Sequence, residues 1–436
     1  MVGSWPDELY EQASEPVALA CLELLSDEDR WIHRRVETID LLAQELVRRQ
    51  VTVEFTLPEP LHAELRVGPQ GPWCVPVAIL EKRPLRNFDL RENDEPRPIL
   101  GASSGGPVAA ALVTAAARLA TAPEPLDHGV VALLELIVRS DLDAARIALA
   151  DLHARAERAP QLAAILADDT SAYFAATFAE SYMLVALLAQ PHGRRILKYA
   201  YDEHLASVGG RAGRARRIAR RLGWSPLVID IDVPTAAHAA SYHAEVVVPE
   251  ELRLDAFVLD AWSGELLTTD IERGVDRASL HAPSVPLRAD PVLTTAISAE
   301  RSGVPTLALV ISAVTSLLLV LGASVARLDS PTAGSSVAVL LAGSALFAAA
   351  VARGHEHRLV RGIFAAPRWL LSIVAVAALA AGASVAFGAD PGVRDGVWYC
   401  AFAASGLSCL GLAVACWRAA PLTRRPARGA DEDLRR

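Results

Sequence analysis

The stretch VPTLALVISAVTSLLLVLGASVA, residues 304–326, contains no Asp, Glu, Lys, Arg or His. A helix needs roughly 20 apolar residues to cross the hydrocarbon core of a bilayer, about 30 Å thick, because its backbone must satisfy its own hydrogen bonds there. Three more uncharged apolar stretches follow at residues 335–352, 369–388 and 397–417. The sequence therefore predicts a multi-pass integral membrane protein with an all-α bundle of four transmembrane helices at 304–417.

The formal charge of the chain changes sign where the apolar stretches begin. The first 300 residues carry a net charge of −15 and the remainder carries +6, within a total of −9. An acidic region is repelled by nucleic acid and, as a whole, by anionic lipid. We therefore expect no nucleic-acid partner. Membrane lipids should surround the apolar stretches, and a cytoplasmic protein or a small ligand is the expected partner of the acidic region.

The charges between the apolar stretches orient the spans. The segments 327–333 and 389–396 are poor in arginine, whereas 353–368 and the tail 418–436 are rich in it. Because basic loops stay on the cytoplasmic side, both termini are expected in the cytoplasm, with the protein in the cell membrane. The acidic opening, residues 1–11, lacks the features of a secretory signal, which agrees with this orientation.

The predicted spans contain none of the ionisable residues that ion and proton pathways generally use. Small residues recur at four-residue spacing instead, as in the pair Ser312 and Ser316 and in the series Ala378, Gly382 and Ala386. Such spacing lets helix backbones pack closely. A compact anchor bundle is the favoured interpretation, and the alternative is a hydrophobic pore made by oligomerised spans.

The region before the spans is predicted to be α+β, an antiparallel β-sheet with a helical insertion. Residues 15–50 are predicted to form two helices with a break at 26–29, the second with apolar side chains at helical spacing. Residues 51–57 and 227–233 alternate as half-buried strands that are expected to pair in one sheet. Residues 171–190 are nearly all apolar and are interpreted as a buried core helix. The predicted divisions are an N-terminal helical segment 1–50, an α+β domain 51–281 (strands 51–100, helices 107–190, strands 226–281), and a Pro-rich connector 282–303.

Ser103 is the one candidate nucleophile. It lies in the motif GASSG, residues 101–105, which fits the G-x-S-x-G pattern of a nucleophile elbow. His128 or His281 would have to act as its base. The competing interpretation is a Gly/Ser turn before a helix that starts at Pro107, and it is favoured because the preceding chain lacks alternating strands and helices.

An arginine cluster gives the second candidate site, for anionic lipid or phosphate. In an otherwise acidic region it would lie close to the membrane, but a solvated surface is the favoured interpretation, because runs of charge are commonly solvated. The residues on one flank of the predicted helix are Arg211, Arg214, Arg217 and Arg221. The pairs Asp230 with Asp232 and His355 with His357 are weak metal candidates, and the five cysteines show no ligand spacing. No metal or cofactor is therefore expected.

The strand at 53–58 followed by LRNFDLR at 85–91, the segment ASYHAEV at 240–246, and the C-terminal spans together resemble uncharacterised multi-pass membrane proteins of high-GC bacteria. The resemblance implies the layout and no activity. The sequence favours a non-enzymatic, membrane-anchored binding, scaffold or sensor protein, with an oligomer allowed. The alternatives are a serine hydrolase that uses Ser103 and a membrane-permeabilising effector formed by oligomerised spans.

Overall fold

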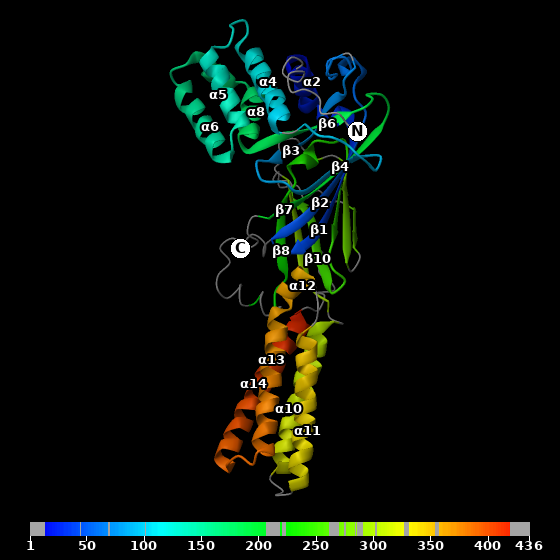
Figure 1. The fold of residues 1–436 in the computed structure, drawn as a ribbon, viewed down its shortest axis with the longest axis vertical. Helices are drawn as coiled ribbons and strands as arrows, with labels where there is room; N and C mark the ends of the chain where they lie inside the picture. Colours follow the sequence, from blue (N-terminus) through cyan, green and yellow to red (C-terminus); the bar gives the residue numbers. More distant parts are fainter. Residues whose placement is uncertain are drawn as a thin grey trace.

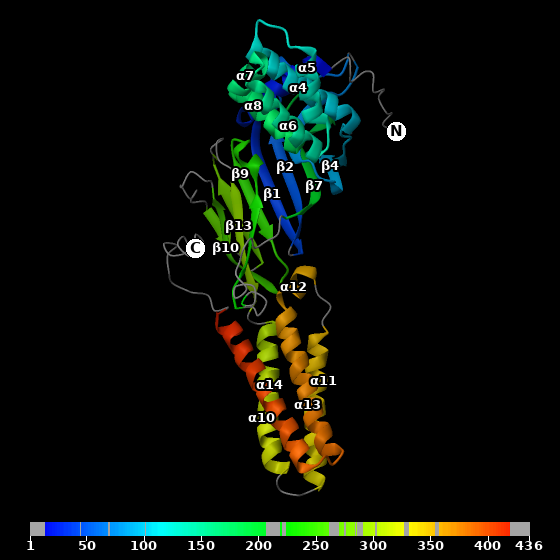
Figure 2. The same ribbon diagram turned by 90° about the vertical axis from the view of Figure 1, so that its left-hand side faces the viewer.

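The computed structural model describes residues 14–43, 45–68, 70–100, 102–205, 219, 224–260, 270–273, 276–283, 285, 291–300, 303–326, 331–353 and 357–418. These residues form an α+β region followed by four long apolar helices, which confirms the predicted fold class. The molecule is elongated: a block of helices lies at one end, the sheets lie in the middle, and the apolar helices lie at the other end (Figure 1 and Figure 2).

The largest sheet has eight strands and supplies the frame of the α+β region. All neighbouring strands are antiparallel except the pair β1 and β9, which is parallel. The order across the sheet is β11 (Asp270–Arg273), β12 (Arg277–Ala282), β9 (Tyr242–Val247), β1 (Ile32–Ala43), β2 (Leu46–Phe55), β7 (Arg195–His204), β4 (Arg86–Glu92) and β5 (Glu95–Pro96).

Two smaller sheets and a set of helices complete the region. One sheet has the order β10 (Leu252–Asp260), β13 (Val292–Ala299) and β8 (Leu227–Asp232), and the other pairs β3 (Trp73–Glu81) with β6 (Ser181–Leu188). The helices are α2 (Ser14–Ser26), α3 (Glu28–Trp31), α4 (Ala102–Thr121), α5 (His128–Arg139), α6 (Leu142–Ala156), α7 (Pro160–Ala167) and α8 (Asp169–Glu180), with short 3-10 turns η1 (Glu59–Leu61) and η2 (Pro234–Ala237).

Aspartate caps start three helices of the block. The side chains of Asp127, Asp141 and Asp168 accept hydrogen bonds from the first-turn amides of α5, α6 and α8, at 2.7, 2.9 and 2.8 Å. Such caps satisfy amides that have no partner within the helix. The Lys82 ammonium, just after β3, donates to the carbonyls of Ile137 and Ser140 at the end of α5, each at 2.9 Å. The block is thereby tied to the two-stranded sheet.

Two hydrophobic cores share the eight-stranded sheet. The first lies beneath α2 and the helical block, where Val51, Val53 and Phe55 of β2 are buried. The second lies between the eight-stranded and three-stranded sheets, where Ile39 and Leu41 of β1 are buried. Strands β1 and β2 therefore run from one core into the other (Figure 2).

The predicted helix at 28–50 is wrong beyond its first turn, because this segment forms the hairpin of β1 and β2. The inward face of β1 carries Arg35 and Glu37 before Ile39 and Leu41. Two charged residues on the buried face hide the two-residue alternation that identifies a strand. Among the described residues of the predicted N-terminal helical segment, only Ser14–Ser26 and Glu28–Trp31 are helical.

Two further expectations about the strands are wrong. The segments 51–57 and 227–233 do not pair, because β2 belongs to the eight-stranded sheet and β8 to the three-stranded one. The predicted core helix at 171–190 ends at Glu180, and the rest of its apolar run forms β6. From Met183 to Leu188 every residue of β6 is buried, so both of its faces are covered and periodicity alone cannot separate it from a buried helix.

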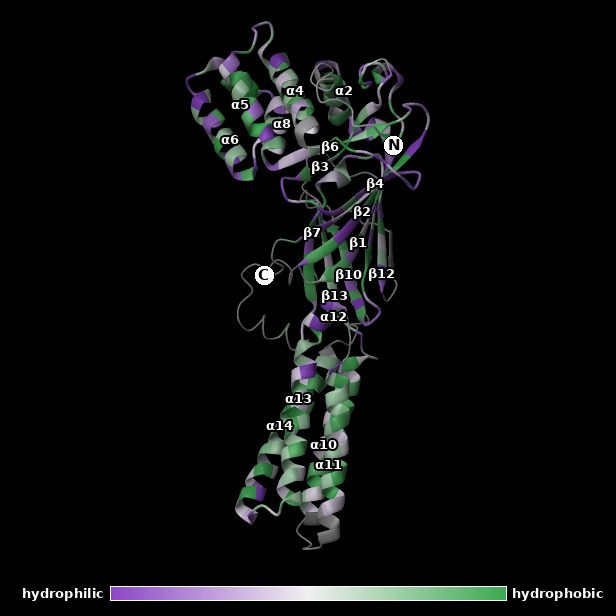
Figure 3. Ribbon diagram, in the orientation of Figure 1, coloured by the Kyte–Doolittle hydropathy of each residue, from purple (hydrophilic) through white to green (hydrophobic). Residues whose placement is uncertain are grey.

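The apolar part consists of α10 (Val304–Ala326), α11 (Pro331–Ala352), α13 (Ala365–Ala386) and α14 (Pro391–Arg418), with the short α12 (Arg358–Ile363) between α11 and α13. Each of the four long helices is long and apolar enough to cross a membrane (Figure 3). The fourth candidate span, Pro391–Trp417, starts six residues before the predicted one and so includes Arg394 and Asp395.

Close packing in the bundle uses the small residues identified in the sequence. A Cβ atom added to Gly382 of α13 would lie 3.4 Å from the Ala338 carbonyl oxygen of α11. The hydroxyl groups of Ser316 and Ser405 lie 2.7 Å apart between α10 and α14, and Ser405 also donates to the carbonyl of Ser312 at 3.2 Å. Small side chains and interhelical hydrogen bonds are the means by which helices associate in lipid.

Candidate functional site

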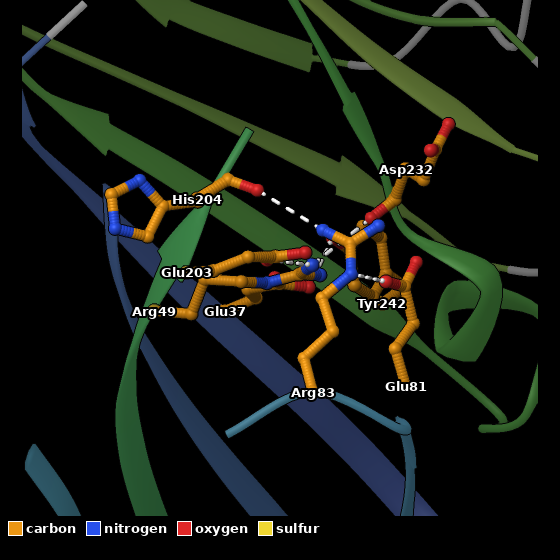
Figure 4. A network of polar contacts seen from close by, with 8 residues as sticks. All are labelled: Glu37, Arg49, Glu81, Arg83, Glu203, His204, Asp232 and Tyr242. Carbon is orange, nitrogen blue, oxygen red and sulfur yellow. Dashed lines mark hydrogen bonds and ion pairs between the residues drawn. The ribbon is translucent and has the colours of Figure 1, made fainter. Parts of the chain in front are cut away.

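A buried network of charged side chains lies where the two cores of the sheet meet. It joins Glu37 of β1, Arg49 of β2, Glu203 of β7 and Tyr242 of β9, all on the same face of the eight-stranded sheet (Figure 4). Side chains on one face recur every second residue along a strand. The strand registers bring these four side chains together. Arg49 lies opposite Ile39 of β1 and Tyr201 of β7, and Glu37 and Glu203 are each two residues from these partners along their own strands.

Arg49 is the centre of this network. Its Nε donates to Glu37 Oε1 at 2.6 Å, and its Nη1 donates to Glu203 Oε2 at 2.8 Å and to the backbone oxygen of Asp232 at 3.1 Å. The Tyr242 hydroxyl donates to Glu37 Oε2 at 2.9 Å. Both oxygens of Glu37 are therefore satisfied, and one guanidinium connects three strands of the large sheet to β8 of the small one.

Burial and charge act in opposite directions on Arg49. Burial alone would lower the pKa of this guanidinium, but the Glu37 carboxylate, with Tyr201 and Glu203, raises the pKa well above its ordinary value. Burial, reinforced by the Glu37 carboxylate, raises the pKa of Tyr242. Tyr242 thus remains a hydrogen-bond donor to Glu37, and Arg49 remains charged. Arg49 and Tyr242 therefore both act as hydrogen-bond donors in the network.

A second buried arginine extends the charged face toward α3. Arg35 is 1% exposed and lies opposite Tyr242, and its Nη2 is 3.8 Å from Glu28 Oε2. The same Glu28 oxygen lies 3.1 Å from Nδ1 of His238, just after η2. Glu28, Arg35 and His238 therefore connect α3, β1 and the segment that leads into β9.

The rim of the network is polar and more exposed. Arg83 lies 2.6 Å from Glu81, measured from its Nε to the carboxylate, and its Nη1 donates to the backbone oxygen of His204 at 3.2 Å (Figure 4). These contacts join the chain after β3 to the end of β7. The network as a whole holds the two sheets together through hydrogen bonds and ion pairs, so its role is structural.

Helix α12 docks into the second core and joins the α+β region to the membrane part. Leu359, Val360 and Phe364 are at most 1% exposed and pack in the same cluster as Ile39 and Leu41 of β1. His357 caps the helix, because its Nδ1 accepts from the Leu359 amide at 3.4 Å. Phe364 both ends α12 and precedes α13. A connection between two candidate spans thus completes the core of the sandwich.

Two more contacts hold the sheets on the apolar helices. Ala299 at the end of β13 and Val304 at the start of α10 both pack against the second core. The Trp224 indole Nε1 donates to the carbonyl of Gly411 in α14 at 3.1 Å. The α+β region is therefore attached to α10, α13 and α14, and the α11–α13 connection lies on the same side of the bundle as the sheets (Figure 1).

Ser103 and the two histidines considered as its base lie on three different elements. Ser103 lies in the first turn of α4, which starts at Ala102 and contains Pro107 within it, so the predicted helix start at Pro107 is wrong. A 20-residue helix such as α4 is about 30 Å long, and α5 begins with His128 shortly after the far end of α4. His281 lies on β12, in the eight-stranded sheet.

The remaining sequence candidates form no site among the described residues. The cluster Arg211, Arg214, Arg217 and Arg221 lies outside the described residues, as does His355. Asp230 accepts a hydrogen bond from the Thr294 hydroxyl at 2.8 Å. Within the described part of the chain, no group of three or more His, Cys, Asp and Glu side chains could hold a metal ion.

Sequence reasoning missed the charged network because it treated residues 28–50 as a helix. A strand reading of the same residues puts Glu37 on the face of Ile39 and Leu41, and Arg49 on the face of Val47. A charged residue on an otherwise apolar strand face is the signal that would have found it, because buried charges are generally paired.

A histidine pair on the opposite face of the sheet predicts a pH dependence. His243 and His281 are cross-strand neighbours with ring centroids 4.2 Å apart. Burial, then Arg34 and His281, lower the pKa of His243 to about 4. Because the unfolded chain binds this proton more readily, stability present above about pH 6.5 is expected to fall as the pH drops toward 4.

His243→Gln is expected to flatten this part of the stability profile. The measurement is the midpoint of urea unfolding of the full chain in detergent between pH 4 and 7. His153→Gln, on the exposed surface of α6, is the matched control and should leave the profile unchanged. If the urea midpoint of His243→Gln falls between pH 7 and pH 4 as steeply as that of the unchanged chain, this histidine does not contribute to the pH dependence of stability.

Comparison with known proteins gives no family for this chain. No family model matches the chain, and no curated protein matches its sequence.

Proposed function

We propose that this protein is a non-enzymatic, membrane-anchored binding or sensor protein whose α+β region responds to a partner and transmits the response to the membrane helices. The observation that carries the proposal is the docking of α12, whose Leu359, Val360 and Phe364 are buried in the second core. Phe364 leads directly into α13. A rearrangement of the sheets therefore has a direct packed route to a candidate span.

The charge distribution supports a cytoplasmic position for the α+β region. The connection that contains α12 carries four arginines, at positions 353, 358, 361 and 368, and it lies on the same side of the bundle as the sheets. Loops rich in arginine are retained on the cytoplasmic side. The sheets and the helical block would then meet cytoplasmic partners.

The helical block is the part best placed to bind a protein partner, because it lies farthest from the apolar helices (Figure 2). Leu119, Leu136 and Ile147, on α4, α5 and α6, are 67%, 50% and 72% exposed. Exposed aliphatic residues are ordinary when they occur singly. Their occurrence on three successive helices at the free end supports a protein contact there.

Photo-crosslinking in native membranes tests this function. A photoreactive phenylalanine at position 147 of the full chain is expected to give one discrete adduct, and the same residue at position 50 is expected to give none. Gln50 is the matched control, since it is also exposed but lies on β2. Replacing Phe364 with alanine should leave the adduct intact while it releases α12, as seen by hydrogen–deuterium exchange.

Two results would contradict the proposal. The first is the absence of an adduct from positions 119, 136 and 147 under all native conditions, which would remove the partner. The second is labelling of the full chain by a serine-reactive fluorophosphonate that disappears in Ser103→Ala, which would replace a binding protein by a hydrolase.

A further inference from the structure

A pocket between α10 and α14 lies at the end of the bundle that is remote from the sheets. It has a volume of about 220 Å³. Leu319, Val320 and Phe402 form apolar walls, Ala323 lies among them, and Arg394 and Asp395 are the two charged residues that line it. An apolar groove with a cationic and an anionic group at its mouth fits an amphiphile with charges of both signs.

The charged mouth of this pocket lies at headgroup depth. The candidate span Pro391–Trp417 has 27 residues, which corresponds to about 40 Å of helix, whereas the hydrocarbon core is about 30 Å thick. The uncharged part of α14 begins at Gly396, so the excess turns are those that carry Arg394 and Asp395. Trp398 and Tyr399 follow at the level where aromatic side chains prefer to lie.

The two charged groups are only weakly paired with each other. Arg394 Nε lies 4.0 Å from Asp395 Oδ1, and the two side chains are 31% and 69% exposed. Neighbouring residues on a helix do not face each other, so they cannot form a two-pronged pair. A guanidinium has five N–H donors and a carboxylate only acceptors, and both retain most of this capacity here.

We propose that the pocket binds one zwitterionic phospholipid with an ethanolamine headgroup. Its phosphate pairs with Arg394, its primary ammonium donates to Asp395, and an acyl chain lies against Leu319, Val320 and Phe402. An anionic headgroup without an amine would leave Asp395 facing like charge. A choline headgroup offers no N–H to this carboxylate, so the chemistry favours the primary ammonium.

Native mass spectrometry of the full chain, released from nanodiscs of equal phosphatidylethanolamine, phosphatidylcholine and phosphatidylglycerol content, tests this site. We expect one tightly retained phosphatidylethanolamine. Asp395→Asn should lower its retention about tenfold while leaving phosphatidylglycerol unaffected or better retained, because the lost hydrogen bond involves two charged groups. Arg394→Gln should weaken retention of both, since both lipids carry the phosphate.

Two further variants separate a built site from ordinary surrounding lipid. Ala323→Phe fills the groove without changing charge and is expected to displace the retained lipid. Arg361→Gln removes a charge at the opposite end of the bundle, on the exposed side of α12, and should change nothing. Equal retention of the three lipids, or retention that survives both Asp395→Asn and Ala323→Phe, would overturn the proposal.

Discussion

Replacing Arg49 with methionine is expected to lower the free energy of unfolding of the α+β region by about 3–5 kcal/mol, because Glu37 then stays buried without its guanidinium. Glu203 and the backbone oxygen of Asp232 would lose the same donor. A loss of that size is a large fraction of the total stability of most domains. The variant should therefore unfold at a much lower denaturant concentration.

The measurement is urea unfolding of the full chain in detergent, with hydrogen exchange of β1 and β2 as a local readout. Arg277→Gln is the matched control, because its ion pair with Glu245 at 3.0 Å is on the exposed face and should contribute about 0–1 kcal/mol. The double variant Glu37→Gln with Arg49→Met removes both charges and should recover part of the loss. An Arg49→Met chain as stable as the control would show that the network is not a structural pin.

Phe364→Ala is expected to cost about 3–5 kcal/mol and to detach α12 from the sandwich, because the Phe364 ring is 1% exposed within the second core. Two local changes in hydrogen exchange should accompany this loss of stability. Amides of α12 should exchange faster with solvent, and so should those of β1, against which α12 packs.

Phe347→Ala provides the matched control for this variant. Phe347 lies on α11 and is 55% exposed on the apolar surface of the bundle, so its removal should leave the sheets and α12 unchanged. Equal exchange of α12 in the Phe364→Ala and unchanged chains would mean that the helix is held by its connections alone. It would also remove the packed route on which the proposed function depends.

The four long apolar helices could be predicted from the sequence because each is identified by some twenty consecutive, mostly apolar residues. The α+β region was readable only as a class. Strand β1 and the first half of β2 were mistaken for a helix, because Arg35, Glu37 and Arg49 occupy inward positions that an alternating pattern reserves for apolar residues. The second half of β2 was correctly predicted as a strand. The side chains that pair with Arg49 and Glu37 include Glu203 and Tyr242, which are more than 150 residues away from Arg49 along the chain.

The candidate sites were harder still to predict, since neither depends on a local motif. The ion-pair network requires knowing that β9 lies beside β1 in parallel, a pairing that no turn between them specifies. The docking of α12 requires knowing that a connection between two spans returns to the sheets. A single sequence contains the residues but not these long-range registers, and a nucleophile motif such as the one around Ser103 was more conspicuous than either.

The placement of Leu359, Val360 and Phe364 also dictates an order of biosynthesis. Residues 358–364 leave the ribosome only after α10 and α11 have been made, so the second core stays incompletely filled until then. Until then the apolar side chains that pack against Leu359, Val360 and Phe364 lack these neighbours. The last apolar side chains of this core thus come from a segment that follows two candidate spans in the chain, so the α+β region is completed only after half of the apolar part has been made.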